Sequence, residues 1–192
     1  MSKEVFIIVG LGNPGPEYAH TRHNAGFETV ALLEKTYGTA LGRKTLQGLL
    51  AEAPREDRKI VLCEPQTYMN NSGECVSQLL SWYHCGPDHL LVICDDIDLP
   101  PGRVRVRRSG GPGTHNGMRS IVEHLGTREF PRIRIGTGDR PAGWDLADWV
   151  LSHYQTREGQ DAMAAAFHRA ADAVELWLDR GIDEAMQQCN RP

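Results

Sequence analysis

The sequence predicts an α/β fold, because short apolar strands alternate with segments of helical periodicity. Two runs, residues 5–9 and 90–94, are wholly apolar. Such runs are typical of strands buried on both faces, as in the centre of a parallel sheet. Apolar residues at helical spacing mark later segments, most clearly 161–178. The two buried strands are therefore expected in the middle of the sheet, with helices packed against them.

The other elements can be placed in order along the chain. We expect helices at about 27–37, 73–83, 118–125, 161–178 and 182–188, and strands at 5–9, 46–53, 58–64, 90–94, 103–107 and 132–135. Residues 54–57 would form the turn of a hairpin. Gly181 is expected to end the long helix, because glycine is common just after a helix C-terminus. The segment 137–152, rich in Gly, Trp and Asp, is expected to be a mobile loop or a short lid.

Length and composition exclude several classes of protein. The 192 residues fit one domain, 1–192, with a sizeable core. No apolar run approaches the ~20 residues needed to span a bilayer, and the first ten residues lack the apolar core of a signal peptide. The five cysteines form no C-x-x-C pair, which favours reduced thiols and argues against a structural zinc site. We therefore expect a cytoplasmic protein that contacts no membrane.

Charge is unevenly distributed along the chain. The net charge is −4, yet residues 101–140 carry 9 basic and 3 acidic residues. Within 103–107, strict alternation places three guanidiniums on one face of a strand, and Arg132 and Arg134 likewise share a face. Two such strands side by side would form a basic plate for the phosphates of a polyanion. Protection of an edge strand by charge is the alternative.

Polar side chains gather just after the first strand, where open α/β sheets bind their ligands. They are Asn13, Tyr18, His20, Arg22, His23 and Asn24. His23 is either a catalytic or a structural, hydrogen-bonded histidine. The glycines at 10, 12 and 15 also match the dinucleotide fingerprint G-x-G-x-x-G. However, Pro14 removes one backbone N–H, and the helix does not begin until after His23, so a nucleotide site is disfavoured.

Three carboxylates, Asp95, Asp96 and Asp98, follow the strand at 90–94. They could bind a divalent metal, or one could orient another catalytic group; the further ligands that a metal needs are not evident. A second His-Asn pair, His115-Asn116, lies in a glycine-rich loop before a helix N-terminus, where backbone N–H groups favour anions. Asn116 is expected to cap this helix, to bind a substrate, or both.

Several motifs, in this order, resemble bacterial peptidyl-tRNA hydrolase: VGLGNPGPEYAHTRHNAGF, EPQTYMNNSG, DDIDLPPG with VRVRR, GGPGTHNGMRSI and FPRIRIG. Each alone is moderate evidence, but together they span nearly the whole chain. The resemblance implies a single-domain three-layer α/β/α fold with a twisted mixed, mostly parallel sheet. It also implies a cytoplasmic monomer, without metal or cofactor, that hydrolyses the ester between peptide and tRNA in peptidyl-tRNA from stalled or aborted translation and so recycles tRNA.

The same resemblance implies roles for single residues. His23 resembles the catalytic base that activates water, Asp95 the carboxylate that orients this base, and Asn13 a residue that positions the substrate at the reacting centre. Substrate-contacting positions are Tyr18, Tyr68, Met69, Asn70 and Asn116, and tRNA phosphate-binding positions are Arg105, Arg107 and Arg134. Histidine titrates near neutral pH, as a base for ester hydrolysis requires. A serine nucleophile is disfavoured, since no G-x-S-x-G motif is present.

The sequence also departs from the family pattern. Thr114 and Ser109 stand where the loop before His115 usually has glycine, which leaves the flexibility of this loop open. Arginine replaces a frequent lysine at 105 and 107, and both residue types bind phosphate. The alternative function is a non-catalytic RNA-binding relative, similar to the organellar group II intron splicing factors that share the fold. Such a relative would need an added partner surface, and no insertion for one is evident. A dinucleotide-dependent enzyme is a third hypothesis.

Overall fold

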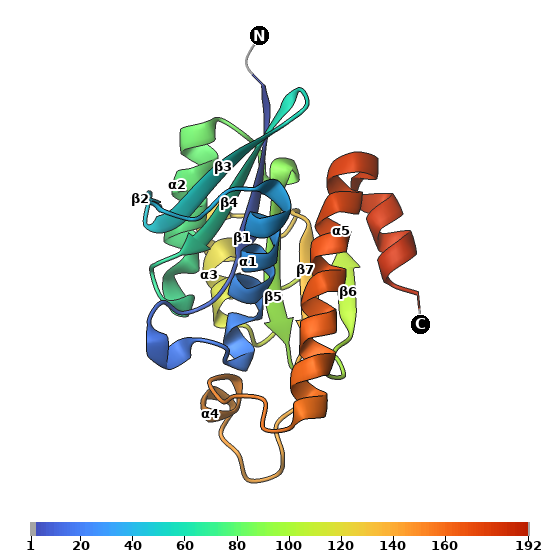
Figure 1. The fold of residues 1–192 in the computed structure, drawn as a ribbon. Helices are drawn as coiled ribbons and strands as arrows, with labels where there is room; N and C mark the ends of the chain where they lie inside the picture. Colours follow the sequence, from blue (N-terminus) through green and yellow to red (C-terminus); the bar gives the residue numbers. More distant parts are fainter. Residues whose placement is uncertain (1–2, 192) are drawn as a thin grey trace.

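The computed structural model describes residues 3–191, and its strands form one seven-stranded sheet in the order β2-β3-β4-β1-β5-β7-β6 (Figure 1). The strands are β1 (Glu4–Gly10), β2 (Arg43–Thr45), β3 (Gly48–Arg55), β4 (Arg58–Pro65), β5 (Leu90–Asp96), β6 (Val104–Arg107) and β7 (Arg132–Gly136). The central strands β4, β1, β5 and β7 pair in parallel, while β2-β3-β4 and β6-β7 pair antiparallel. The predicted α/β fold with a mixed sheet is confirmed, with parallel pairing at its centre and antiparallel pairing toward both edges.

Five α-helices and four short 3-10 turns connect the strands within residues 3–191. The helices are α1 (Ala25–Tyr37), α2 (Ser72–Tyr83), α3 (Asn116–Leu125), α4 (Leu146–Val150) and α5 (Arg157–Cys189), and the turns are η1 (Pro16–Tyr18), η2 (Arg22–Asn24), η3 (Met69–Asn71) and η4 (Pro87–His89). Gly181, with φ 82° and ψ 174°, breaks α5 where the sequence predicted a helix end. None of the helices in the described part of the chain has the length and apolar character that a bilayer crossing requires.

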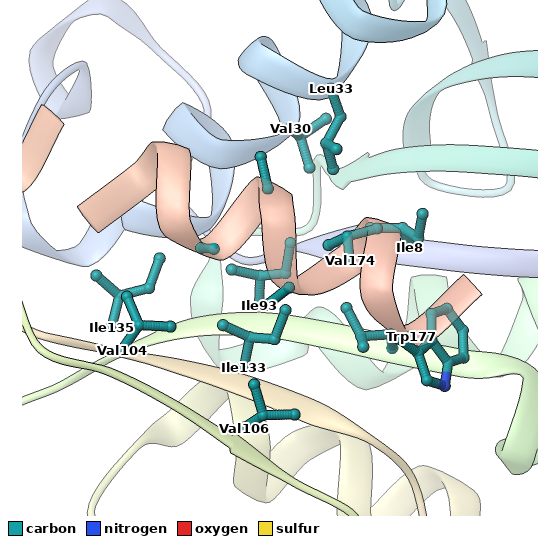
Figure 2. Close-up of a cluster of buried hydrophobic side chains, with 14 of the residues drawn as sticks. Ile8, Val30, Leu33, Ile93, Val104, Val106, Ile133, Ile135, Val174 and Trp177 are labelled. Atoms are coloured by element: carbon teal, nitrogen blue, oxygen red, sulfur yellow. The ribbon is translucent and has the colours of Figure 1, made fainter. Parts of the chain in front are cut away.

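Helices cover both faces of the sheet, so side chains of alternating strand positions are buried on opposite sides. On one face, α1 and α5 pack on Ile8, Ile93 and Ile133, and Val174 and Trp177 of α5 lie over these strands (Figure 2). On the other face, α2 and α3 cover residues such as Ile7, Val9 and Val92. Burial on both faces explains why β1 and β5 are nearly continuous apolar runs.

A close contact between β1 and α1 places the polar loop over the sheet. A Cβ at Gly10 would lie 2.3 Å from the carbonyl oxygen of Gly26, and one at Gly26 would lie 2.2 Å from the nitrogen of Leu11. Only glycine allows this approach at both positions. This close approach places η2, which carries His23, beside the C-terminal end of β5. The glycine at position 10 is therefore explained by packing against α1, which begins only at Ala25.

Candidate active site

Two imidazoles converge on one buried carboxylate at the C-terminal ends of β1 and β5. His23 comes from η2, Asp95 from the end of β5, and His115 from the N-terminus of α3. The Nδ1 atom of His23 lies 2.9 Å from Oδ1 and 3.0 Å from Oδ2 of Asp95. The Nε2 atom of His115 lies 2.9 Å from Oδ1 of the same carboxylate. Asp95 itself is only 3% exposed.

The hydrogen bonds determine which ring nitrogens carry protons. An ionised carboxylate only accepts, so Nδ1 of His23 donates to Asp95, and Nε2 keeps its lone pair when the ring is neutral. In His115, Nδ1 accepts the N–H of Met118 at 3.2 Å, and therefore Nε2 carries the proton donated to Asp95. Within residues 3–191, no protein group bonds to Nε2 of His23. His23 thus has the tautomer that a general base needs.

Burial and charge act in opposite directions on the pKa values of this cluster. Burial raises the pKa of Asp95, but the two imidazoles lower it more, and the net pKa is well below its usual range. Burial lowers the pKa of His23, whereas the charge of Asp95 and its hydrogen bond raise it, and the net pKa lies above the ordinary histidine value. Asp95 is therefore an anion that favours the imidazolium form of His23.

A cavity of about 650 Å³ opens over His23 and Asp95. It is bounded by the loop after β1, by η3, by the N-terminus of α3 and by α4. The predicted substrate-contacting residues all line it: Tyr18, Tyr68, Met69, Asn70 and Asn116, together with Asn13. Tyr18 and Tyr68 meet edge to face with ring centroids 6.3 Å apart, and Tyr68 is 53% exposed. The cavity therefore offers both amide groups and aromatic surface beside His23.

Asn13 is fixed by backbone contacts that orient its side-chain amide. Its Oδ1 accepts the N–H of Met69 at 2.7 Å. Its own backbone N–H donates to Oδ1 of Asn24 at 2.9 Å, and Nδ2 of Asn24 donates back to the Asn13 carbonyl at 3.0 Å. Because the N–H of Met69 can only donate, the Asn13 atom that it contacts is the acceptor Oδ1. The donor Nδ2 of Asn13 takes no part in this contact, and Asn13 lines the cavity. The sequence indicated Asn24 only as a member of the polar cluster; the structure shows that it holds Asn13.

Comparison with known proteins bears directly on this site. Residues 7–192 match the family model described as peptidyl-tRNA hydrolase. The chain belongs to the peptidyl-tRNA hydrolase family. The relative from Geobacillus thermodenitrificans is 48% identical over 184 residues, covering 96% of this chain and 98% of the relative. The relative from Lachnospira eligens is 44% identical over 186 residues, covering 97% and 100%. The resemblance inferred from the motifs is thereby confirmed.

Solved structures agree with this family assignment. A crystal structure of peptidyl-tRNA hydrolase from Acinetobacter baumannii has a TM-score of 0.90 and 37% identity, covering 99% of this chain and 96% of that chain. A 5'-methylthioadenosine nucleosidase from Arabidopsis thaliana has a TM-score of 0.55 at 10% identity, and it shows likeness of fold alone.

The arginines expected from the peptidyl-tRNA hydrolase resemblance lie on neighbouring strands. In the β6-β7 register Arg105 stands opposite Arg134. Arg134 lines the cavity, and its Nε lies 3.2 Å from Oδ2 of Asp96. Arg105 and Arg107 are half-buried and lie outside the cavity lining; within residues 3–191 neither forms an ion pair. A row of guanidiniums therefore runs from the cavity to the edge strand.

The prediction that Arg132 belongs to this basic plate is wrong. Arg132 is 1% exposed, and its guanidinium donates to the carbonyl oxygens of Gly110, Arg128 and Phe130. Alternation along β7 correctly put it on the same side as Arg134, but the glycine-rich loop folds over it. Burial lowers the pKa of Arg132 to about 10. Its role is to hold the start of the loop that leads to His115.

Helix capping also differs from expectation. His115, through Nδ1, caps α3, and Asn116 is the first residue of that helix. The Oδ1 atom of Asn116 accepts from Arg119 at 3.2 Å, and Asn116 is free to line the cavity. At α2, the N-cap position Asn71 makes no side-chain capping bond, and the hydroxyl of Ser72 donates to the Met69 carbonyl. Asn70, which the family resemblance assigns to substrate, faces the cavity.

The cluster fits a hydrogen-bonded pair of imidazoles better than a metal centre. The ligand atoms of His23, Asp95 and His115 all lie within 4.8 Å of one another, as in a candidate metal site. A metal on Nε2 of His115 would require that nitrogen to lose its proton. The proton would then move to Nδ1, where the N–H of Met118 already donates. Asp96 is also engaged, with Arg134 and with the N–H of Asp98. Metal binding would therefore disrupt the capping of α3.

Arg22, whose role the sequence did not indicate, joins the segment 137–152 to the loop that carries His23. Its Nη1 donates to Oγ of Ser152 at 2.5 Å and to the carbonyl of His153 at 2.8 Å. Its guanidinium stacks on Trp149 of α4, whose Nε1 donates to the Gly138 carbonyl at 2.9 Å. Residues of this segment line the cavity: Asp145, Leu146, Ala147, Val150 and Leu151. The segment thus forms one wall of the site.

Proposed function

We propose that this chain hydrolyses the ester bond between the peptide and the tRNA in peptidyl-tRNA, with His23 as general base. The observation that carries the proposal is the pairing of His23 Nδ1 with the buried Asp95, which leaves Nε2 unbonded in a cavity lined by amides. Membership of the peptidyl-tRNA hydrolase family supplies the substrate. In this proposal residues 1–192 act as a single catalytic domain, a cytoplasmic monomer without a cofactor.

The reaction follows from the hydrogen bonds of the site. Nε2 of His23 takes a proton from water as the water oxygen attacks the ester carbonyl, and Asp95 stabilises the imidazolium that forms. The oxyanion accepts a hydrogen bond from Nδ2 of Asn13; losing one such donor typically slows catalysis by about 10²–10³. The ribose oxygen then leaves with the proton from His23. The products are a peptide with a free carboxyl group and a tRNA with a free terminal hydroxyl.

The remaining site residues would hold the two halves of the substrate. Asn70 and Asn116 offer amide groups to the peptide backbone, beside Met69. Tyr18 and Tyr68 offer aromatic faces on which a base can stack at the mouth of the cavity. Arg105, Arg107 and Arg134 would bind phosphates of the tRNA, which is a polyanion of the kind that the basic segment predicts.

The test is hydrolysis of N-acetyl-aminoacyl-tRNA, with unblocked aminoacyl-tRNA in parallel. We expect rapid release of the N-acetyl-amino acid, and His23→Ala should abolish it while leaving the fold and most of the tRNA affinity intact. His20→Ala, in the same loop and paired with Glu28, is the matched control and should retain activity. Near-wild-type hydrolysis by a folded His23→Ala protein would refute the mechanism. Tight RNA binding by the wild type without any hydrolysis would instead support the splicing-factor alternative, which family membership does not favour.

A further inference from the structure

A second hollow lies outside the catalytic cavity, between α5 on one side and the edge strand β6 with the loop before it on the other. These two elements contact each other and lie side by side at one edge of the molecule (Figure 1). The hollow is a groove of about 930 Å³. The charged residues that line it are Arg103, Arg105, Arg169, Arg191 and Asp172.

The groove is lined by four arginines and one carboxylate, Asp172, so its lining has a net positive charge. None of the four arginines forms an ion pair within residues 3–191, whereas Arg55 and Arg108 each pair with acidic residues of α5. The polar contacts of the groove arginines are to neutral carbonyls: Arg169 donates to that of Gly102, and Nε of Arg191 donates to that of Gln187 at 3.2 Å. On a protein of net charge −4, such a cluster attracts an anion.

The two walls of the groove are joined by the side chain of Asn190. Its Oδ1 accepts the N–H of Val106 at 2.8 Å, and its Nδ2 donates to the carbonyl of Val106 at 2.9 Å. Backbone groups of a strand residue point to one side, so Val106 bonds Asn190 on the side away from β7. Asn190 therefore fixes β6 to the end of α5, and the backbone segments that carry Arg105 and Arg191 are joined before any ligand binds.

We propose that this groove is a second phosphate-binding site, which holds the backbone of the tRNA part of the substrate. The inference rests on the proposed function. Arg134 lines the catalytic cavity, Arg105 stands opposite it on β6, and Arg105 also lines the groove. Arg105 thus lies between Arg134, which lines the cavity, and Arg169 and Arg191, which line the groove on the far side of β6. An RNA backbone, with a phosphate on every nucleotide, matches a path of separated guanidiniums better than a single small anion does.

The experiment compares two double variants that change the net charge equally. Arg169→Ala/Arg191→Ala removes the groove arginine of α5 and the one that follows the helix, and Arg157→Ala/Arg180→Ala removes two exposed arginines of α5 outside the groove. We expect the groove variant to raise KM for N-acetyl-aminoacyl-tRNA about tenfold at low salt and to flatten the log-log salt dependence by about one unit for each phosphate that is no longer bound. Its kcat, and its cleavage of an N-acetyl-aminoacyl-adenosine ester, should match those of the wild type.

Binding of uncharged tRNA, followed by fluorescence anisotropy in the same salt series, separates this inference from the proposed function. The groove variant should bind more weakly than the control variant. Equal affinities of the two variants would overturn the groove as a specific site, whatever the hydrolysis assay shows. Absence of hydrolysis by the wild type would overturn the proposed function alone. Circular dichroism checks that each variant is folded. If the double variant is unstable, the single variant Arg191→Ala, which loses one exposed side chain, replaces it in the binding assay.

Discussion

The guanidinium carbon of Arg22 lies 3.7 Å from the ring centroid of Trp149, and Arg22 is the residue directly before His23. The same guanidinium lies 4.7 Å from the ring of Tyr154. Arg22 is only 7% exposed, and a desolvated cation over an aromatic face contributes about 2 kcal/mol. One side chain therefore holds together the α4 wall of the cavity and the loop that carries His23.

Arg22→Lys should weaken binding of the substrate. Lysine keeps the charge but loses the planar fork that both stacks on Trp149 and bonds to Ser152. We expect KM to rise about tenfold on peptidyl-tRNA and on a minimal adenosine ester alike, because the affected wall bounds the cavity that contains His23. Hydrogen exchange over 145–152 should become faster. Arg180→Lys, on the surface of α5, is the control; an unchanged KM for the minimal ester would contradict the coupling.

Asp95→Asn should slow hydrolysis on the order of a hundredfold or more, since it removes the charge that stabilises the imidazolium. It should also shift the pH profile. The base must be unprotonated, and Asp95 raises the pKa of His23, so wild-type activity falls as pH drops through that raised value. Without the carboxylate the pKa of His23 falls, and the acid limb of kcat/KM moves to lower pH. Asp98→Asn, in the same cavity, is the control and should leave the acid limb of kcat/KM at its wild-type pH. If the acid limb of Asp95→Asn also stays at the wild-type pH, Asp95 does not raise the pKa of His23.

His115→Asn should move the acid limb of kcat/KM to higher pH, opposite to the shift expected for Asp95→Asn. Asparagine is a good N-cap, so α3 should keep its cap while Asp95 loses one of its two imidazole donors. The carboxylate charge then acts more fully on His23, and the pKa of His23 rises. We expect the acid limb of kcat/KM to move to higher pH, with a smaller loss of kcat than in Asp95→Asn. A shift to lower pH would show that His115 does not compete with His23 for Asp95.

Activity should persist in EDTA, because both imidazoles of the cluster are committed to hydrogen bonds with Asp95. The assay is hydrolysis of N-acetyl-aminoacyl-tRNA with and without chelator, and a minimal adenosine ester is the control for effects of Mg²⁺ on tRNA folding. Loss of cleavage of the minimal ester in EDTA, restored by an added divalent ion, would identify a metal at Asp95.

Arg105→Ala/Arg107→Ala should raise KM for peptidyl-tRNA and flatten its salt dependence by about one unit of log-log slope for each phosphate that the variant fails to bind. Cleavage of the minimal ester, which lacks the acceptor arm, should barely change, and kcat should fall little because His23 is untouched. Arg128→Ala/Arg140→Ala, two exposed arginines outside the cavity and the groove, is the matched control. An equal loss on both substrates would mean that Arg105 and Arg107 support the fold and do not bind tRNA.

The sequence pattern predicted most of the strands and helices, including the short strands β6 and β7, but it missed β2 and α4. The strand β2 has three residues with no buried side chain, and α4 has five, so neither carries a readable pattern. The pairing of His23 with Asp95 was implied by the family resemblance, and the structure places both residues at the C-terminal ends of central strands. The contacts of His115, Arg22 and Arg132 were not predictable, since each depends on how a loop folds over the sheet and not on which face a strand residue occupies.

The paired hydrogen bonds between Asn190 and Val106 have a consequence for self-association. β6 ends the sheet, and an exposed edge strand is a template on which a second chain can add a strand. The side-chain amide of Asn190 bonds both the N–H and the carbonyl of Val106, so these groups in the middle of the four-residue strand cannot pair with another chain. Asn190→Ala would free both groups. At the concentrations reached during expression, we expect this variant to form soluble aggregates, and light scattering should detect them before any loss of secondary structure.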